Sequence, residues 1–292
     1  HLHDPRAMAL AIAADRLYNL PPFLFSKKTS FPIKDRKQTL YKYNYHKIKK
    51  YLCVSETTRQ VLSQSVDRTQ DMVTIYHGTR TDDKNTDTPY ALRQKLNIAP
   101  GAKIIGNISN HIKAKNLEGF IEVAKYLIQD KGQQDLHFVQ IGTFTERTPE
   151  LLDRVKRLNL EDRVHFLGYL PRASNFIPQF DTTLVTSISE GLPQVIYESF
   201  YHQVPVVSTN VGGIAEIIQH GENGFLSETG DHRELGQQLL ALLQDAALRD
   251  RFTEISRALL LEKFTTAIMA QQTLQQYKAV KEQNISSRSR VE

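Results

Sequence analysis

Short apolar runs alternate with segments of helical periodicity through the last two thirds of the chain, and this alternation restricts the fold to a few layered architectures. The runs are rich in β-branched residues, as strands are, and most of the segments between them have helical spacing. Strands that alternate with helices predict a parallel sheet covered on both faces. The expected strands are 103–107, 136–141, 164–167, 183–186, 204–208 and 224–226, and the clearest helices are 117–129, 149–158 and 235–244.

A shorter unit of the same kind precedes this one. It is predicted to contain a helix over 7–20, strands at 51–55 and 73–76, and a helix that starts at Ser55-Glu56. The chain begins without Met at a strand end, His1-Leu2-His3-Asp4, so we expect a fragment whose first domain is incomplete. A run of polar residues marks the linker between the two units. The expected division is a first domain over 1–80, a linker over 81–90, a second domain over 91–268, and a terminal helix with a disordered tail over 269–292. The last stretch with helical periodicity is 252–283, and the disordered tail is expected to begin at Asn284.

Two carboxylates bracket a Gly-Leu-Pro turn directly after one of the predicted strands. Glu190 follows the strand, Gly191 and Leu192 form the turn, and Glu198 lies on a helix that begins about Pro193. The amino end of this helix points at the carboxyl end of the strand, which is where open α/β sheets bind ligands. Backbone N–H groups around the turn suit a diphosphate, and the two carboxylates suit sugar and ribose hydroxyls. The run therefore predicts a nucleotide-sugar site.

This segment resembles the donor site of the retaining GT-B glycosyltransferases, in particular family 4 (group 1), whose pattern is Glu, seven residues, Glu. The resemblance covers 1–277 and is strongest over 168–231. It implies a GT-B fold of two Rossmann-like, doubly wound domains, the first of them incomplete here. It also implies that Glu190 contacts the transferred sugar, that Glu198 contacts the ribose, and that His3 lies near the reacting carbon.

A second loop is expected to hold the diphosphate. Gly106 and Asn107 end the first strand of the second domain, and Asn107 occupies the position where the family most often has Arg. The resemblance implies a phosphate lysine in the following loop, for which Lys115 is our choice and Lys113 the competitor. A pair of surface lysines with no role in binding is the alternative.

Three glycines complete the expected donor site. Gly168 and Tyr169 follow a strand, and the resemblance implies that backbone groups there contact the nucleobase, although core packing explains this pattern nearly as well. Gly212 and Gly213 precede 214–218, which we expect to form an amphipathic helix. They are expected to let the chain pass close to the donor.

Positive charge is concentrated at the start of the chain. Residues 1–50 hold 11 Lys and Arg against 3 Asp, which leaves the other residues slightly acidic in a chain of net charge +5. Between 27 and 50 the cations are interleaved with Phe31, Tyr41, Tyr43 and Tyr45. A solvated face, an anionic membrane surface, and an acidic acceptor or nucleic acid all remain open for 27–50, although a nucleic-acid partner is not expected.

Composition and motifs limit the remaining possibilities. The single cysteine, Cys53, cannot form an internal disulfide, which predicts a cytoplasmic protein, peripheral on the inner face of the membrane if 27–50 binds lipid. No cluster has metal-ligand spacing, so neither a metal nor another cofactor is expected.

The function implied by the resemblance is retaining transfer of a sugar from a nucleoside diphosphate to a glycan, lipid or other acceptor, in cell-surface polysaccharide biosynthesis. Lys115 would stabilise the departing diphosphate, while Glu190 and His3 position the sugar. A non-catalytic nucleotide-sugar-binding fragment and a GT-B nucleotide-sugar epimerase are the alternatives. An α-glucan phosphorylase would need a lysine for pyridoxal phosphate, and the sequence has no signature of one.

Overall fold

The computed structural model describes residues 1–82 and 86–288 and divides the chain into two compact units. Unit 1 consists of His1–Gly78 together with Lys263–Glu292, and unit 2 is Thr79–Glu262. The expected linker, 81–90, belongs to unit 2, and part of it, Asp83 included, lies outside the described residues. The chain returns to unit 1 at Lys263, earlier than the expected boundary at 268.

Unit 1 is built on a parallel sheet in the order β1-β2-β3. Leu2 extends this sheet beside β1, because its N–H donates to Leu24 O over 2.8 Å and its carbonyl accepts from Ser26 N over 2.8 Å. The opening residues therefore form a strand end, as the sequence predicts. Strand β1 and helix α2 were not predicted, since both lie where prolines and lysines mask short apolar runs. The strands are β1 (Phe23–Lys27), β2 (Ile48–Cys53) and β3 (Met72–Thr74).

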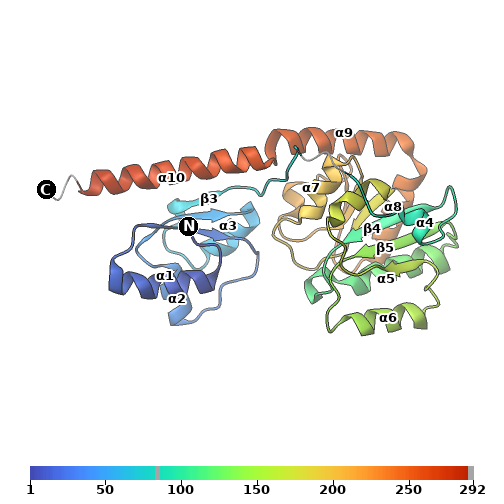
Figure 1. Ribbon diagram of the computed structural model, residues 1–292, viewed down its shortest axis with the longest axis horizontal. Coiled ribbons are helices and arrows are strands. Elements are labelled where there is room, and N and C mark those ends of the chain that lie inside the picture. The colour runs from blue at the N-terminus through green and yellow to red at the C-terminus, as the bar shows by residue number, and fades with distance from the viewer. Residues whose placement is uncertain (83–85, 289–292) are drawn as a thin grey trace. The chain divides into compact units, whose positions relative to one another are not determined.

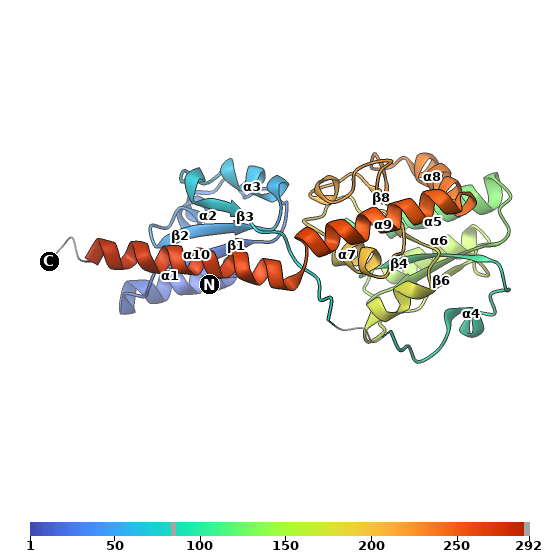
Figure 2. The same cartoon turned by 90° about the horizontal axis from the view of Figure 1, so that it is seen from above.

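Helices cover both faces of this sheet (Figures 1 and 2). On one face Met8 and Ile12 of α1 pack against β1 and β2, and on the other Val280 of α10 packs against Leu24 and Leu52. Side-chain oxygens of Asp4 and Ser55 cap α1 and α3 by accepting from backbone N–H groups. The helices are α1 (Pro5–Tyr18), α2 (Lys37–Tyr43), α3 (Glu56–Ser63) and α10 (Thr266–Arg288), with a 3-10 turn η1 (Thr69–Asp71).

The predicted terminal helix over 252–283 is two helices. Helix α9 (Ala246–Lys263) ends and α10 begins at Thr266, and the break lies against Gly78, where a Cβ would come 2.2 Å from the carbonyl oxygen of Thr265. Helix α10 continues to Arg288, so the tail predicted from Asn284 is helical over its described part, and 289–292 lie outside the described residues.

Unit 2 contains a parallel sheet in the order β6-β5-β4-β7-β8-β9. Each predicted strand is present, within one or two residues at either end, which confirms an α/β fold. The strands are β4 (Lys103–Ile108), β5 (Leu136–Ile141), β6 (Val164–Phe166), β7 (Thr182–Val185), β8 (Val206–Thr209) and β9 (Phe225–Ser227).

Helices lie on both faces of the unit 2 sheet. One face packs against α5, α6 and α8, and the other against α4, η4 and α7. The helix expected over 214–218 is only a 3-10 turn, η5 (Ile214–Glu216), followed by the buried Ile217 and Ile218. The remaining elements are α4 (Leu92–Lys95), η2 (Lys113–Lys115), α5 (Leu117–Lys125), the π-helical turn η3 (Tyr126–Asp130), α6 (Thr148–Arg157), η4 (Ala173–Gln179), α7 (Gln194–Tyr201) and α8 (His232–Gln244).

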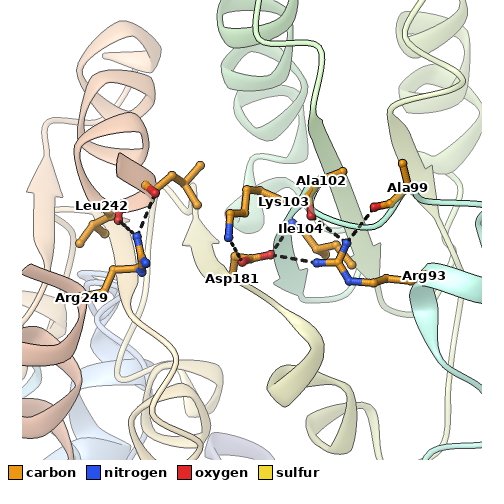
Figure 3. A network of polar contacts seen from close by, with 9 residues as sticks. Arg93, Ala99, Ala102, Lys103, Ile104, Asp181, Leu242 and Arg249 are labelled. Atoms are coloured by element: carbon orange, nitrogen blue, oxygen red, sulfur yellow. Dashed lines mark hydrogen bonds and ion pairs between the residues drawn. The ribbon is translucent and has the colours of Figure 1, made fainter. Parts of the chain in front are cut away.

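A network of polar contacts joins the amino ends of β4 and β7 (Figure 3). Asp181 accepts from Lys103 Nζ over 2.9 Å and from Ile104 N over 2.9 Å, and Arg93 lies 3.5 Å away. Arg93 also donates to the carbonyl of Ala102. Since these groups satisfy one another, this edge has a structural role, and the chemistry is to be sought at the carboxyl edge.

The aromatic residues of the basic segment do not all face solvent. Tyr43 and Tyr45 belong to the core of unit 1, whereas Phe31 and Tyr41 are 56% and 50% exposed. Lys27 is buried and donates to Thr29 and to the carbonyl of Phe31. Within 1–82 and 86–288, no helix has both the length and the apolar character needed to cross a membrane.

Candidate functional site

The sheet of unit 2 reverses its direction of growth between β4 and β7. From β4 the chain adds β5 and β6 on one side, and β7, β8 and β9 follow on the other. In open parallel sheets, ligands bind at such a reversal, in the crevice outside the carboxyl ends of the strands. The loops over 109–116 and 186–193 leave these two strand ends and therefore border the candidate site.

The two loops are bonded directly to each other. Ile188 N donates to the carbonyl of Ala114 over 2.8 Å, and the hydroxyl of Thr186 donates to the carbonyl of Asn116 over 2.9 Å. The hydroxyl of Thr209, at the end of β8, donates to Ser187 O over 2.6 Å. The backbone around the site is thus held by contacts between three neighbouring strand ends.

An ion pair joins the side chains of the two loops. Lys115 Nζ lies 2.6 Å from Glu190 Oε1, and Ser187 Oγ donates to the same oxygen over 2.6 Å. The side chain of Glu190 is 9% exposed and that of Lys115 is 23% exposed. Lys113, the competing lysine, is exposed on the same loop. The structure therefore brings together two of the predicted site residues, Lys115 and Glu190, and leaves Lys113 in solvent.

Gly212 and Gly213 hold the loop that carries Glu190. Gly213 N donates to Gly191 O over 2.9 Å. Gly212 has a φ of +58°, and a Cβ at this position would lie 1.8 Å from Glu190 O. A side chain could not fit there without moving the Glu190 peptide, so these glycines support the loop by close backbone packing.

Glu198 lies on α7, two turns beyond the Gly191-Leu192 turn. It is half-buried, and burial raises the pKa of its carboxyl group. A carboxyl group in such surroundings favours partners that supply hydrogen bonds, because these compensate for lost hydration. Tyr197 and Ser199, its neighbours on the helix, are buried in the core.

Two residues predicted to contact the diphosphate have structural roles in the sheet. Gly106 lies inside β4, where a Cβ would meet the Phe180 ring at 2.0 Å, so the glycine makes room for that ring. Asn107 is 3% exposed, and its amide donates to Leu184 O over 2.8 Å and accepts from Ser109 Oγ over 2.7 Å. The Asn107 side chain is thus turned into the sheet, where it ties β4 to β7.

The strand end expected to meet the nucleobase has a backbone conformation that favours glycine. Gly168 has a φ of +73°, and its carbonyl accepts from Gly142 N over 3.0 Å. Tyr169, which follows it, is 70% exposed. The end of β6 is thereby fixed to the end of β5, at the same edge of the sheet as Lys115 and Glu190.

His3 belongs to unit 1, where it follows the Leu2 strand end and precedes the Asp4 cap of α1. Its ring lies 4.0 Å from that of His1 between centroids. Burial, assisted by Lys28, lowers the pKa of the His3 imidazole. His1 is itself anchored by Tyr277 and Ser26, at 2.6 Å and 2.8 Å from its two ring nitrogens.

Sequence reasoning did not identify the hydroxyl residues of the site. Ser187 bonds Glu190, while Thr186 and Thr209 fix the loop backbone. The available signal was the polar end of an apolar strand, but which partner each hydroxyl finds depends on chain segments far apart in the sequence. Among the described residues, no three His, Cys, Asp or Glu side chains are grouped so that they could hold a metal ion.

Several named proteins resemble this chain. N-acetyl-alpha-D-glucosaminyl L-malate synthase of Bacillus anthracis is 32% identical over 173 residues, which are 59% of this chain and 44% of that protein. Poly(ribitol-phosphate) alpha-N-acetylglucosaminyltransferase of Staphylococcus aureus is 25% identical over 56% of this chain and 33% of its own length. The chain thus spans less than half the length of these relatives. Others are named as glycosyltransferases of lipopolysaccharide core and capsular polysaccharide biosynthesis.

Solved structures share the fold. HepE of Anabaena in complex with UDP superposes with a TM-score of 0.81 at 21% identity, over 94% of this chain and 76% of that one. This likeness confirms the predicted GT-B architecture. The family model described as glycosyl transferases group 1 matches residues 90–259, more than half of the 292 residues. The chain belongs to the group 1 glycosyl transferases.

Proposed function

We propose that unit 2 binds the donor of a retaining, family 4 glycosyltransferase, which moves a sugar from a nucleoside diphosphate to a glycan or lipid-linked acceptor. The observation that carries this proposal is the Lys115–Glu190 ion pair at the reversal point of the sheet. Relatives named for poly(ribitol-phosphate), capsular polysaccharide and lipopolysaccharide core favour cell-surface polysaccharide biosynthesis.

The ion pair suggests how the donor is held. A diphosphate at this edge would compete with Glu190 for the Lys115 ammonium group, since both are anions. Once Lys115 binds phosphate, Glu190 is released to accept hydrogen bonds from sugar hydroxyls. Lys115 then neutralises charge that develops on the diphosphate as the glycosidic bond breaks. Glu198, whose carboxyl group is half-buried, accepts hydrogen bonds from the ribose diol.

Binding and transfer separate this proposal from a non-catalytic fragment. We expect UDP to bind the chain in calorimetry, Lys115→Met to weaken UDP binding about tenfold or more, and Lys113→Met, its exposed neighbour, to leave binding unchanged. Equal effects of the two substitutions would contradict the assignment of Lys115. Binding of UDP-sugars without transfer or hydrolysis would favour the binding-fragment alternative, and a changed sugar in the recovered nucleotide would indicate an epimerase.

The resemblance assigns His3 a place near the reacting carbon. We expect His3→Ala to reduce sugar transfer while UDP binding by unit 2 stays unchanged, because His3 belongs to unit 1. We also propose that no metal is obligatory. Transfer that persists in EDTA, and is not increased by added Mg²⁺ or Mn²⁺, would support this.

We further propose that the protein is cytoplasmic and reaches the inner face of the membrane through 27–50. Exposed Phe31 and Tyr41 support this, with the Arg16 guanidinium 5.8 Å from the centre of the Tyr41 ring. Cations near an anionic bilayer contribute about 1 kcal/mol each. Co-sedimentation with phosphatidylserine vesicles, lost in high salt and absent with neutral vesicles, is the expected result. Sedimentation independent of lipid charge would contradict it.

A further inference from the structure

Phe144 is a large apolar side chain that the fold leaves 47% exposed at the functional edge of unit 2. It lies in the turn that follows β5, between the loop after β4 and the strand end of β6. An exposed aromatic ring loses the stabilisation that burial would give it. At this edge of the sheet, where ligands of open α/β sheets bind, such a ring is a candidate to contact one.

Hydrogen bonds on both sides of Phe144 fix its turn. The N–H of Thr143 donates to Asn110 Oδ1 over 3.0 Å, and the hydroxyl of Thr145 donates to His111 O over 2.6 Å. The backbone of the same two loops is joined again where His111 N donates to Thr143 O over 3.2 Å. The position of the Phe144 backbone is thus determined by three bonds to the loop that carries Lys115.

The ring of His111 contacts the buried side of Phe144. His111 is 1% exposed, and its two ring nitrogens lie 2.9 Å from Thr148 Oγ1 and 2.7 Å from Gln140 Oε1. The centroid of its ring lies 5.0 Å from that of Phe144. Burial lowers the pKa of the imidazole, so it stays neutral at physiological pH. One side of Phe144 is therefore backed by a buried ring that cannot turn away.

Gly168 lies beside the Phe144 ring. A Cβ on Gly168 would be 3.6 Å from two ring carbons of Phe144. The backbone at the end of β6, with its polar groups, thus borders the exposed aromatic ring. Adjacent strands lie about 4.8 Å apart, so a ligand that extends from Lys115 along the edge crosses the end of β5 on its way to β6.

We propose that Phe144 is the stacking platform for the nucleobase of the donor, with His111 as the residue that positions it. The base would lie on the exposed part of the ring while the backbone near Gly168 contacts its edge. Stacking is tolerant of the base, since every base has a π-face, so Phe144 would set affinity for the nucleoside more than the choice among bases. This inference rests on the proposed donor site of unit 2.

The test is titration calorimetry with UDP, UMP, ADP and inorganic pyrophosphate. We expect Phe144→Ala to weaken the binding of UDP and UMP roughly 5- to 100-fold and the binding of ADP similarly. The affinity for pyrophosphate should stay unchanged. Phe144→Tyr should restore binding of both uridine nucleotides. Leu152→Ala, which truncates a 45% exposed side chain on α6, is the matched control and should bind all four ligands as the parent does.

The following results would contradict the proposal. Phe144→Ala binding UMP as tightly as the parent would overturn the platform, and so would an equal loss of pyrophosphate binding, which would indicate a damaged loop. A parent protein that binds UDP while Phe144→Ala binds UDP just as tightly refutes the platform alone. A parent that binds none of the nucleotides refutes the donor site and the platform together.

Discussion

Gly212→Ala tests whether the Glu190 loop depends on close backbone packing. Two costs follow from the structure. Alanine at a φ of +58° costs about 1–2 kcal/mol, and its Cβ would lie 1.8 Å from Glu190 O, where real contacts stay above 3.0 Å. The Glu190 peptide must then move by more than an ångström, and forced repacking of this kind costs about 1–3 kcal/mol. The free energy of unfolding of unit 2 should fall by about 2–5 kcal/mol.

Gly221→Ala is the matched control. Gly221 also has a positive φ, +80°, but a Cβ there meets nothing within 4 Å. It shares the backbone cost without the collision, so urea denaturation should show a difference of about 1–3 kcal/mol between the two variants. Because the moved peptide adjoins the Gly191-Leu192 turn, whose N–H groups are expected to hold the diphosphate, we also expect UDP binding to weaken in Gly212→Ala alone. Equal destabilisation of the two variants, with equal UDP binding, would refute the packing argument.

Two further predictions concern buried titratable groups. Burial, with His165 and Arg163 beside it, lowers the pKa of His137 to about 4. Because the unfolded chain then binds a proton at this histidine more readily than the folded one, the free energy of unfolding should fall by at most about 3 kcal/mol as the pH drops from 6.5 to 4. Urea midpoints across this window should show a shallower slope for His137→Gln, and an unchanged slope would contradict the assignment. Burial raises the pKa of the Cys53 thiol to about 12. The native protein at pH 8 should therefore react with Ellman's reagent only as fast as it unfolds. Rapid labelling of the folded protein would contradict this prediction.

Much of unit 2 could be predicted because its signals are local. Strand 136–141 was placed at its observed bounds, and the run with Glu190 and Glu198 was correctly read as a strand, a turn and a helix. The helix over 214–218 was wrong because Ile217 and Ile218 are buried by neighbouring segments, and tertiary packing, not helical amphipathicity, explains their spacing. The single terminal helix was wrong because the chain breaks at Thr265, whose backbone packs closely against Gly78, a residue distant in the sequence.

The amino-acid sequence alone determined the alternation of strands and helices, the loops that follow each strand, and the carboxylates and lysines those loops carry, since periodicity and turn residues act between near neighbours. Only the tertiary structure paired Lys115 with Glu190 and left Lys113 exposed, turned Asn107 into the sheet, and placed Phe144 over a buried histidine. These outcomes depend on which strand ends lie side by side in a sheet ordered β6-β5-β4-β7-β8-β9. That order joins residues far apart in the chain, and no local pattern encodes it.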